Sequence, residues 1–198
     1  MIDDFRMVLV SDSHGDLESQ GLRPILLREE ATILAHLGDL KEGGGGADDS
    51  PFLAGLLDAR PELRFIHVNG GRDFAPVFRA ALARHPDAKS RQVHGEGRFL
   101  FVHELGPRDG APHPDLWNRL AASPVPPVVC HGHTHRQALG RFRWPLDARA
   151  PAEPLAVQKG LEIPLESGHA WCLNPGAFNQ GEYAILICRS GGLFARFQ

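Results

Sequence analysis

The segment 130–135 offers two histidines, His133 and His135, separated by one residue. It follows Val128 and Val129, which favour a short buried strand that breaks at Gly132. In an extended chain such side chains point to the same side, with roots about 6.6 Å apart. Two metal ions in a hydrolytic pair lie about 3.5–4 Å apart, so each imidazole could reach one ion. The pair predicts a metal site only together with further ligands.

Such ligands recur where the predicted strands end. The full set of strand-end carboxylates and imidazoles is Asp12, His14, Asp39, His103, His133 and His135. A mixed set of this kind suits Mn, Fe, Zn, Co or Ni better than Ca or Mg, and one aspartate can bridge two ions. Taken singly, Asp12 also suits a helix cap and Asp39 a turn. Their conjunction predicts a metal centre, whereas His36 and His67 lie mid-strand and are interpreted as structural.

The elements that must position this set alternate along the first half of the chain. Apolar runs predict strands at 5–10, 32–37 and 63–68. Helices are expected after them: from Asp16 towards Glu30, from Ser50 and Pro51, and over 74–85. This alternation predicts a parallel sheet covered by helices, with its site at the carboxyl ends of the strands.

The second half has a different character. A hairpin is expected over 91–102, a short helix over 114–122, and closing strands at 170–173, 183–188 and 193–197. Residues 136–168 are rich in Arg and Pro and show no clear period, so they are interpreted as an irregular insertion within one domain spanning 1–198.

Composition limits the class of protein. The 198 residues are 42% hydrophobic and 23% charged, as in globular domains, and the formal net charge of −3 argues against general nucleic-acid binding. No apolar run is long enough for a membrane span, and the N-terminus lacks signal-peptide features. Three unclustered cysteines indicate reduced thiols, so a cytoplasmic location is expected, and a homo-oligomer is left open.

The strand-end motifs resemble those of the calcineurin-like metallophosphoesterases, in particular the small single-domain prokaryotic phosphodiesterases. The matching motifs are Asp12-Ser13-His14, Gly38-Asp39, His103, Gly132-His133-Thr134-His135 and Asn174-Pro175-Gly176. The resemblance covers nearly the whole chain and implies an α/β fold, a four-layer α/β/β/α sandwich. It also implies two divalent ions, with Mn favoured and Fe, Zn, Ni or Co as alternatives. Asp12, His14 and His135 would hold one ion and His103 and His133 the other, with Asp39 as the bridge.

One motif departs from the family. Where the family has Gly-Asn followed by an acid, this chain reads Asn69-Gly70-Gly71-Arg72-Asp73, which puts Gly71 at the asparagine position. Asn69 is retained as a metal ligand that could reach in if the turn shifts. Arg72 stands where larger relatives have a histidine, and it can hold a phosphoryl oxygen bidentately but cannot donate a proton.

The expected function is therefore a two-metal phosphoesterase that favours diesters over monoesters, with Asp39, Arg72 and His103 as its catalytic residues. Its partner is a phosphate-ester substrate, selected by the Gly43–Gly46 loop and by 136–168. The alternative is a non-catalytic metal-binding or interaction scaffold on the same fold, which the missing asparagine favours and six intact ligand positions oppose. A nuclease is less favoured because of the acidic balance.

Overall fold

Two β-sheets pack face to face in the computed structural model, which describes residues 4–41, 48–70, 89–105, 114–145 and 153–198. In the first sheet, neighbouring strands stand in the order β10 (Glu162–Pro164), β13 (Gly192–Phe197), β12 (Ala184–Arg189), β1 (Phe5–Val10), β2 (Ile33–His36), β3 (Arg64–Val68) and β4 (Lys89–Arg91). Strands β1 to β4 pair in parallel, as the alternation of strands and helices predicts for β1, β2 and β3. Strands β12, β13 and β10 join antiparallel on the far side of β1.

The second sheet holds the other six strands. They stand in the order β5 (Val93–Glu96), β6 (Phe99–Val102), β7 (Val128–Cys130), β11 (His169–Pro175), β8 (Gln137–Arg143) and β9 (Glu153–Leu155). The expected hairpin is β5–β6, which turns at Gly97, where φ is +57° and glycine avoids the strain of a side chain. Strand β7 is parallel to both β6 and β11.

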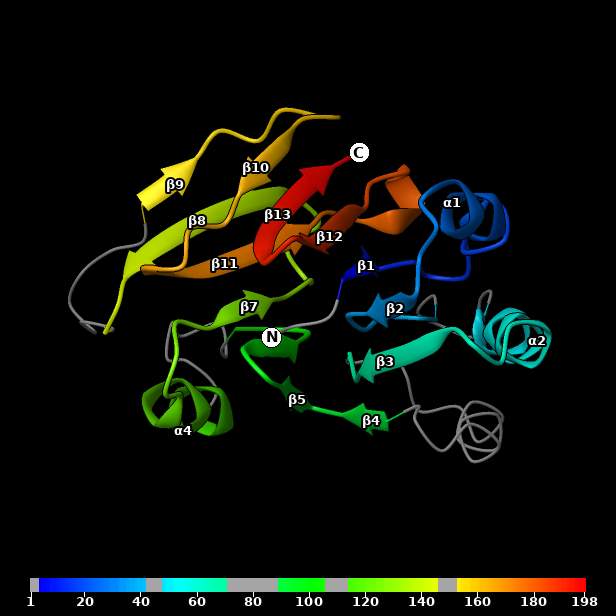
Figure 1. Cartoon of the computed structure of the whole chain (residues 1–198). Helices are drawn as coiled ribbons and strands as arrows, with labels where there is room; N and C mark the ends of the chain where they lie inside the picture. Colours follow the sequence, from blue (N-terminus) through cyan, green and yellow to red (C-terminus); the bar gives the residue numbers. More distant parts are fainter. Residues whose placement is uncertain (1–3, 42–47, 71–88, 106–113, 146–152) are drawn as a thin grey trace.

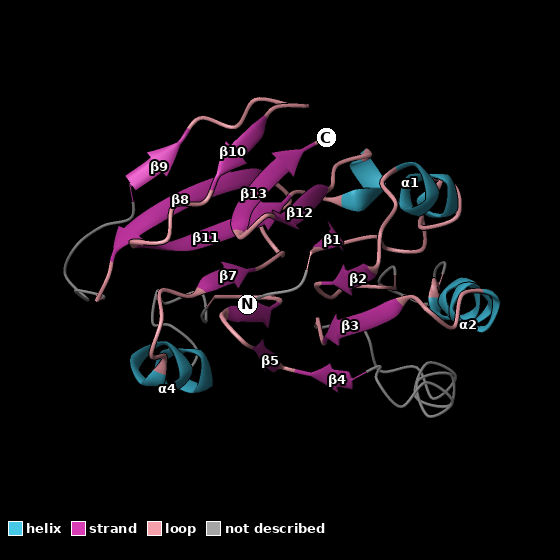
Figure 2. Cartoon of the chain, viewed as in Figure 1, coloured by secondary structure: helices cyan, strands magenta, loops and turns pink. Residues whose placement is uncertain are grey.

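Helices cover the outer face of each sheet, which makes four layers (Figure 1). Helices α1 (Leu22–Arg28) and α2 (Ser50–Ala59) pack on the first sheet, and α4 (Pro114–Ala122) packs on the second through Leu116. A short 3-10 helix, η2 (Phe178–Gln180), leads into β12. The expected α/β/β/α sandwich is confirmed, and Figure 2 shows the two strand layers between the helices.

Strand β1 shows why its sequence is continuously apolar rather than alternating. Met7 and Leu9 point into the core between the two sheets, whereas Val8 and Val10 point to the core under α1 and α2. Both faces of the strand are therefore dry, and only side chains that tolerate burial on either side fit there.

Two expectations about local structure were wrong. Residues 136–168 are not irregular throughout, because they contain β8, β9 and β10. Strand β8 pairs along seven residues with β11, but only Leu139 of it is buried, so the alternation of buried and exposed side chains that marks a strand is weak in its sequence. The first helix begins at Leu22, not near Asp16, so that Pro24 lies in its first turn, where a missing N–H is tolerated.

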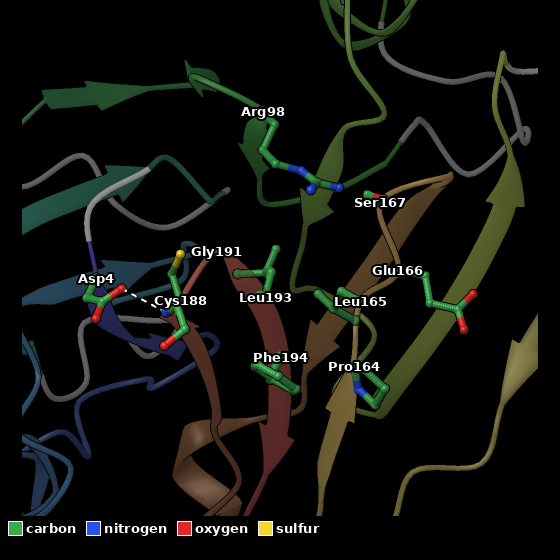
Figure 3. A pocket seen from close by; sticks show the side chains of 12 residues that line it. Asp4, Arg98, Pro164, Leu165, Glu166, Ser167, Cys188, Gly191, Leu193 and Phe194 are labelled. Atoms are coloured by element: carbon green, nitrogen blue, oxygen red, sulfur yellow. Dashed lines mark hydrogen bonds between the residues drawn. The ribbon is translucent and has the colours of Figure 1, made fainter. Parts of the chain in front are cut away.

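A cavity of about 840 Å³ lies at the amino end of β6, away from the strand ends that carry the metal-ligand set (Figure 3). Arg98, Leu165, Cys188 and Leu193 are among its lining residues. Arg98 precedes β6, whereas His103 follows it, so the cavity and His103 lie at opposite ends of the same strand. None of the helices in the described part of the chain has the length and apolar character that a bilayer crossing requires.

The core between the sheets should dominate the stability of the protein. Phe101 is fully buried there, so Phe101→Ala should lower the free energy of unfolding by about 3–5 kcal/mol. Leu27 of α1 is 67% exposed, and Leu27→Ala should change that free energy by no more than about 0.5 kcal/mol. Urea unfolding of both variants measures the difference, and equal losses would contradict this description of the core.

Candidate metal centre

The loops that follow β1 and β2 are hydrogen-bonded to each other beyond the sheet. The Asp12 N–H donates to the Gly38 carbonyl at 3.0 Å, and the His14 N–H donates to the Asp39 carbonyl at 3.1 Å. The parallel pairing of β1 and β2 thus continues into the two motifs and brings Asp12, His14 and Asp39 together.

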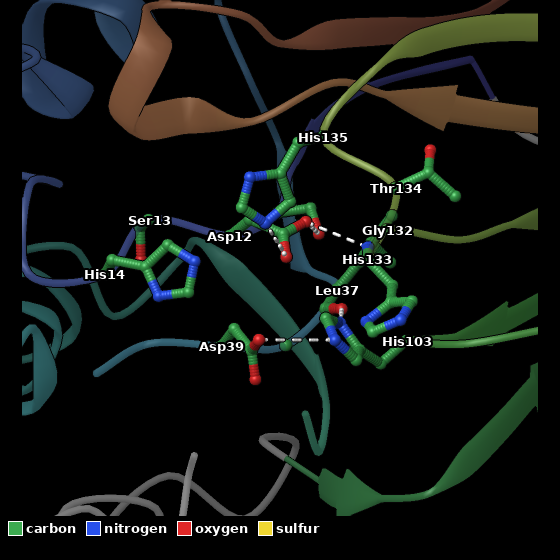
Figure 4. Close-up of polar contacts among 12 residues, drawn as sticks. Asp12, Ser13, His14, Leu37, Asp39, His103, Gly132, His133, Thr134 and His135 are labelled. Carbon is green, nitrogen blue, oxygen red and sulfur yellow. Dashed lines mark hydrogen bonds and ion pairs between the residues drawn. The ribbon is translucent and has the colours of Figure 1, made fainter. Parts of the chain in front are cut away.

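The second sheet contributes the remaining histidines from its two neighbouring parallel strands. His103 follows β6 and His133 and His135 follow β7, and the Gly132 N–H donates to the His103 carbonyl at 3.0 Å. The carboxyl ends of both sheets meet here, so the candidate ligands converge from two sheets (Figure 4).

The expectation that residues 133–135 are extended was wrong. His133 and His135 both have positive φ, +69° and +55°, so the chain turns sharply through the motif. The turn lets the His133 N–H donate to Asp12 Oδ2 at 2.9 Å and sends the two imidazoles in different directions. The ring of His135 lies 5.4 Å from that of His14, and the ring of His133 lies 5.2 Å from that of His103.

Two groups of side chains in the described residues place ligand atoms close enough together to hold an ion. The first is Asp12, His14 and His135, and the second is Asp12, Asp39 and His103. In each group the ligand atoms lie within 4.8 Å of one another. The two groups share Asp12, so two neighbouring cation sites would have a carboxylate in common.

The Asp12 carboxylate has one bonded oxygen and one oxygen without a hydrogen bond. Its Oδ2 accepts hydrogen bonds from the Ser11 hydroxyl and the His133 N–H. Its Oδ1 is buried, has no hydrogen-bond partner in the described chain, and lies 3.1 Å from Nε2 of His135. An unsatisfied buried carboxylate oxygen among imidazole nitrogens is unfavourable, and a cation would satisfy it.

Carbonyl groups fix which nitrogen of two histidines can bind a metal. Nδ1 of His103 lies 2.6 Å from the Leu37 carbonyl, and Nδ1 of His14 lies 3.3 Å from the Lys41 carbonyl. A carbonyl only accepts, so we assign the proton to Nδ1, which leaves the Nε2 lone pair available as a ligand. Both histidines therefore have the tautomer that metal binding needs.

The electrostatics of His103 also favour a cation. Burial lowers the pKa of His103. Its hydrogen bond to Asp39 and the charges of Asp39 and Asp12 raise the pKa by more than burial lowers it, so the pKa lies above its ordinary value. Nε2 of His103 lies 3.5 Å from Asp39 Oδ2. The same carboxylates that favour a proton on this ring would favour a metal ion beside it.

Backbone strain is concentrated in these residues. Seven non-glycine residues of the described chain have positive φ, and five of them are Asp12, His14, Asp39, His133 and His135. A left-handed conformation is unfavourable for residues with a Cβ, by about 1–2 kcal/mol each, and it persists where the surroundings enforce it. Such clustering is typical of functional sites.

Glycines of the motifs allow the loops to approach closely. A Cβ on Gly38 would lie 2.6 Å from His103 Nδ1 and 2.7 Å from the Gly70 nitrogen. A Cβ on Gly70 would overlap Asp39, and one on Gly132 would overlap Ser11. Gly38, Gly70 and Gly132 are therefore required by the contacts between loops, not only by a turn.

Three of the expected site residues are not among the two ligand groups of the described chain. His133 belongs to neither ligand group and lies 3.7 Å from Glu104 Oε1. Asn69 is half-buried at the end of β3. Arg72, like Gly71 and the Gly43–Gly46 loop, lies outside the described residues. The roles of all of these residues stay predictions.

Asn174 begins the Asn-Pro-Gly turn motif, and its side chain makes contacts that the motif alone does not predict. It is fully buried, and its Nδ2 donates to the Gly132 carbonyl at 2.8 Å and to Thr134 Oγ1 at 2.9 Å. Its Oδ1 accepts from the Gly176 N–H at 2.9 Å. The Asn-Pro-Gly turn thus holds the loop that carries His133 and His135. Nearby, burial lowers the pKa of His131 to about 4, so its ring is neutral at pH 7.

Comparison with known families identifies the fold and its chemistry. The family model of the calcineurin-like phosphoesterase superfamily domain matches residues 5–188. The chain belongs to this superfamily. The expected family resemblance is therefore confirmed, and phosphate-ester hydrolysis is the activity that the family supports. No curated protein matches the chain.

Solved structures agree on the fold. A metallophosphoesterase from Sphaerobacter thermophilus has a TM-score of 0.61 at 22% identity, covering 98% of this chain and 88% of that one. A predicted phosphoesterase from Streptococcus pneumoniae has a TM-score of 0.52 at 16% identity, covering 100% of this chain and 90% of that one. The phosphoesterase Yfce from E. coli has a TM-score of 0.50 at 20% identity, covering 91% of this chain and 87% of that one. All three cover most of both chains, so the similarity extends over the whole sandwich.

The close approach of Gly132 to Ser11 gives a test of the site geometry. In Gly132→Ala the new Cβ would lie 2.8 Å from Ser11 Cβ and 3.0 Å from Asp12 Oδ2, so the variant should lose about 1–3 kcal/mol of stability. Adding Ser11→Gly should restore part of this loss, as measured by urea unfolding. Gly168→Ala, where nothing lies within 4 Å, is the matched control. Additive effects at 132 and 11 would contradict the contact.

Proposed function

We propose that the protein is a dinuclear-metal phosphoesterase that acts on phosphodiesters. The observation that carries the proposal is the pair of ligand groups that share Asp12. The first ion would be held by Asp12, His14 and His135, and the second by His103 and His133. The two groups share Asp12 and leave out His133, so the assignment of Asp39 as the bridge and of His133 to the second ion rests on the family resemblance. Residues 1–198 are proposed to form one domain.

The donor types support transition-metal ions. The groups offer carboxylate oxygens and imidazole nitrogens, which suit Mn, Fe, Co, Ni and Zn, and we propose Mn as the working metal. Asn69 is proposed as a supplementary oxygen ligand of the second ion. The orphan oxygen of Asp12 and the Nε2 lone pairs of His14 and His103 are the features that fit such ions.

The chain's own residues would hold and orient the ester. Two bound divalent ions supply a nucleophilic hydroxide at neutral pH and neutralise charge on the phosphoryl group. Arg72 is proposed to hold a phosphoryl oxygen bidentately, and it cannot protonate the leaving group. The rings of His133 and His135 are half-exposed, so a substrate could reach the candidate ligands from solvent.

The preference for diesters rests on the resemblance to small family members. Separately, position 72 holds an arginine where larger relatives have a histidine acid. Without such an acid, a good leaving group or a water must complete the reaction. A screen of phosphomonoesters and phosphodiesters with Mn²⁺ tests the activity. Metal binding without turnover of any ester would favour the scaffold alternative instead.

Asp39→Asn should remove most of the activity and weaken the binding of both ions, because the shared negative charge is lost. His14→Ala should chiefly empty the first site. Metal content after dialysis against Mn²⁺, together with turnover of a phosphodiester, measures both effects. Full turnover and full metal content in Asp39→Asn would exclude Asp39 as the bridge.

The two ions should differ in affinity, because the family's asparagine ligand is replaced by Gly71. Titration with Mn²⁺ should give one tight and one weak site, with activity following the weak one. Gly71→Asn should add a neutral oxygen ligand and lower the Mn²⁺ concentration needed for activity. Equal affinities in the unmodified protein, or an unchanged requirement in Gly71→Asn, would argue that Asn69 already fills this position.

A further inference from the structure

Asp49 occupies the N-cap position of α2 but does not cap that helix. Its side chain makes no cap hydrogen bond, and Asp48 Oδ1 instead accepts from the Ser50 N–H at 2.8 Å. An N-cap carboxylate that bonds its own helix stabilises it by about 1 kcal/mol. The position of the Asp49 carboxylate therefore has to be explained by another contact.

That contact is the loop that carries His14. Asp49 Oδ2 accepts from the Gly15 N–H at 2.9 Å, and Oδ1 accepts from the Leu17 N–H at 2.9 Å. Burial raises the pKa of Asp49, and hydrogen bonds from the Ser13 side chain and these two amides offset this only in part, so the pKa lies above its ordinary value. Only 2% of the residue is exposed, so these donors must compensate for the lost hydration of the carboxylate.

The bonded amide of Gly15 follows His14 directly in the chain. His14 and Gly15 both have positive φ, +50° and +96°, so the backbone turns tightly at this peptide unit. His14 is also held by its own N–H, which donates to the Asp39 carbonyl, and by Nδ1 against the Lys41 carbonyl. The Asp39 and Lys41 contacts use backbone carbonyls, whereas the contact to the Gly15 N–H uses the side chain of Asp49.

The same carboxylate also connects to the neighbouring motif. The Gly38 N–H donates to His36 Nδ1 at 3.2 Å, so Nε2 carries the proton of that ring. Nε2 lies 3.0 Å from the Ser13 hydroxyl, which in turn interacts with Asp49. His36 is therefore structural, as expected, and it links the loop after β1 to the turn before Asp39.

We propose that Asp49 is a positioning residue for the first ion: it holds the His14–Gly15 peptide so that the His14 imidazole meets Asp12 and His135. The inference rests on the proposed function, because it assigns Asp49 to a site in which those three residues bind metal. Asp49 touches no ion itself and acts through the backbone amides of Gly15 and Leu17.

The test is Asp49→Asn, which keeps the size of the side chain but turns an NH₂ group towards one of the two amide donors. Mn²⁺ titration of the metal-free protein should show the affinity of the first site reduced about 10–100-fold, with the second site unchanged. Asp48→Asn is the matched control, because it removes the adjacent carboxylate and a contact of α2. It should lower thermal stability without changing either affinity.

A second variant separates geometry from charge. Asp49→Glu keeps the negative charge but moves the carboxylate by one methylene, so it should also weaken the first site selectively. If Asp49→Asn does not fold, Asp49→Glu tests the inference by itself. Full first-site affinity in Asp49→Glu, equal weakening of both sites in Asp49→Asn, or the same loss in Asp48→Asn would each overturn the inference.

The outcomes also separate this inference from the proposed function. An unmodified protein that binds no Mn²⁺ would overturn both. Two-site binding that is identical in the unmodified protein and in Asp49→Asn would overturn the role of Asp49 alone.

Discussion

The structure of the site depends on how one buried carboxylate, Asp12, is bonded. Two donors hold its Oδ2 while its Oδ1 faces Nε2 of His135 without a hydrogen bond. One of these donors, the His133 N–H, comes from the other sheet, so the bond also fixes the turn that separates His133 from His135. The absence of a side chain at Gly132 follows from the same contact, since a Cβ there would meet Ser11 and Asp12. A carboxylate with both oxygens bonded would be stable but would leave no oxygen for a cation.

The candidate ligands come from both sheets, so the geometry of the site depends on how the two sheets pack. His103 of the second sheet bonds to the Leu37 carbonyl of the first, and the Phe178 N–H bonds to the Ser11 carbonyl. The strain of five left-handed ligand residues is tolerated because the core between the sheets holds their loops together. An ion that binds only this folded arrangement would stabilise it by about 2.7 kcal/mol at a concentration one hundred times its dissociation constant.

Much of this arrangement is predictable from the sequence because it follows from strand ends. The alternation in the first half gives parallel strands, and parallel strands bring Asp12, His14 and Asp39 to one edge. Contacts between loops are not encoded in any local period. The helix expected from Asp16 does not predict that the Gly15 and Leu17 amides bond to Asp49, and the helix start expected at Ser50 and Pro51 does not predict that Asp49 bonds outside its own helix. Strand β8 escaped detection because its neighbours, not its own alternation, define it.

The candidate ligands differ in how completely the protein prearranges them. In the first group, Asp12 is fixed by two donors and His14 by contacts at its N–H, its Nδ1 and the following amide. In the second, Asp12, Asp39 and His103 are all buried and His103 is held by the Leu37 carbonyl. His133, the further ligand proposed for this site, is half-exposed, lies beside Glu104 and stands outside the group. A ligand that must first reorient loses part of its binding free energy in doing so. The buried candidate ligands are therefore arranged before any ion binds, whereas His133 would have to reorient to reach an ion held by Asp39 and His103.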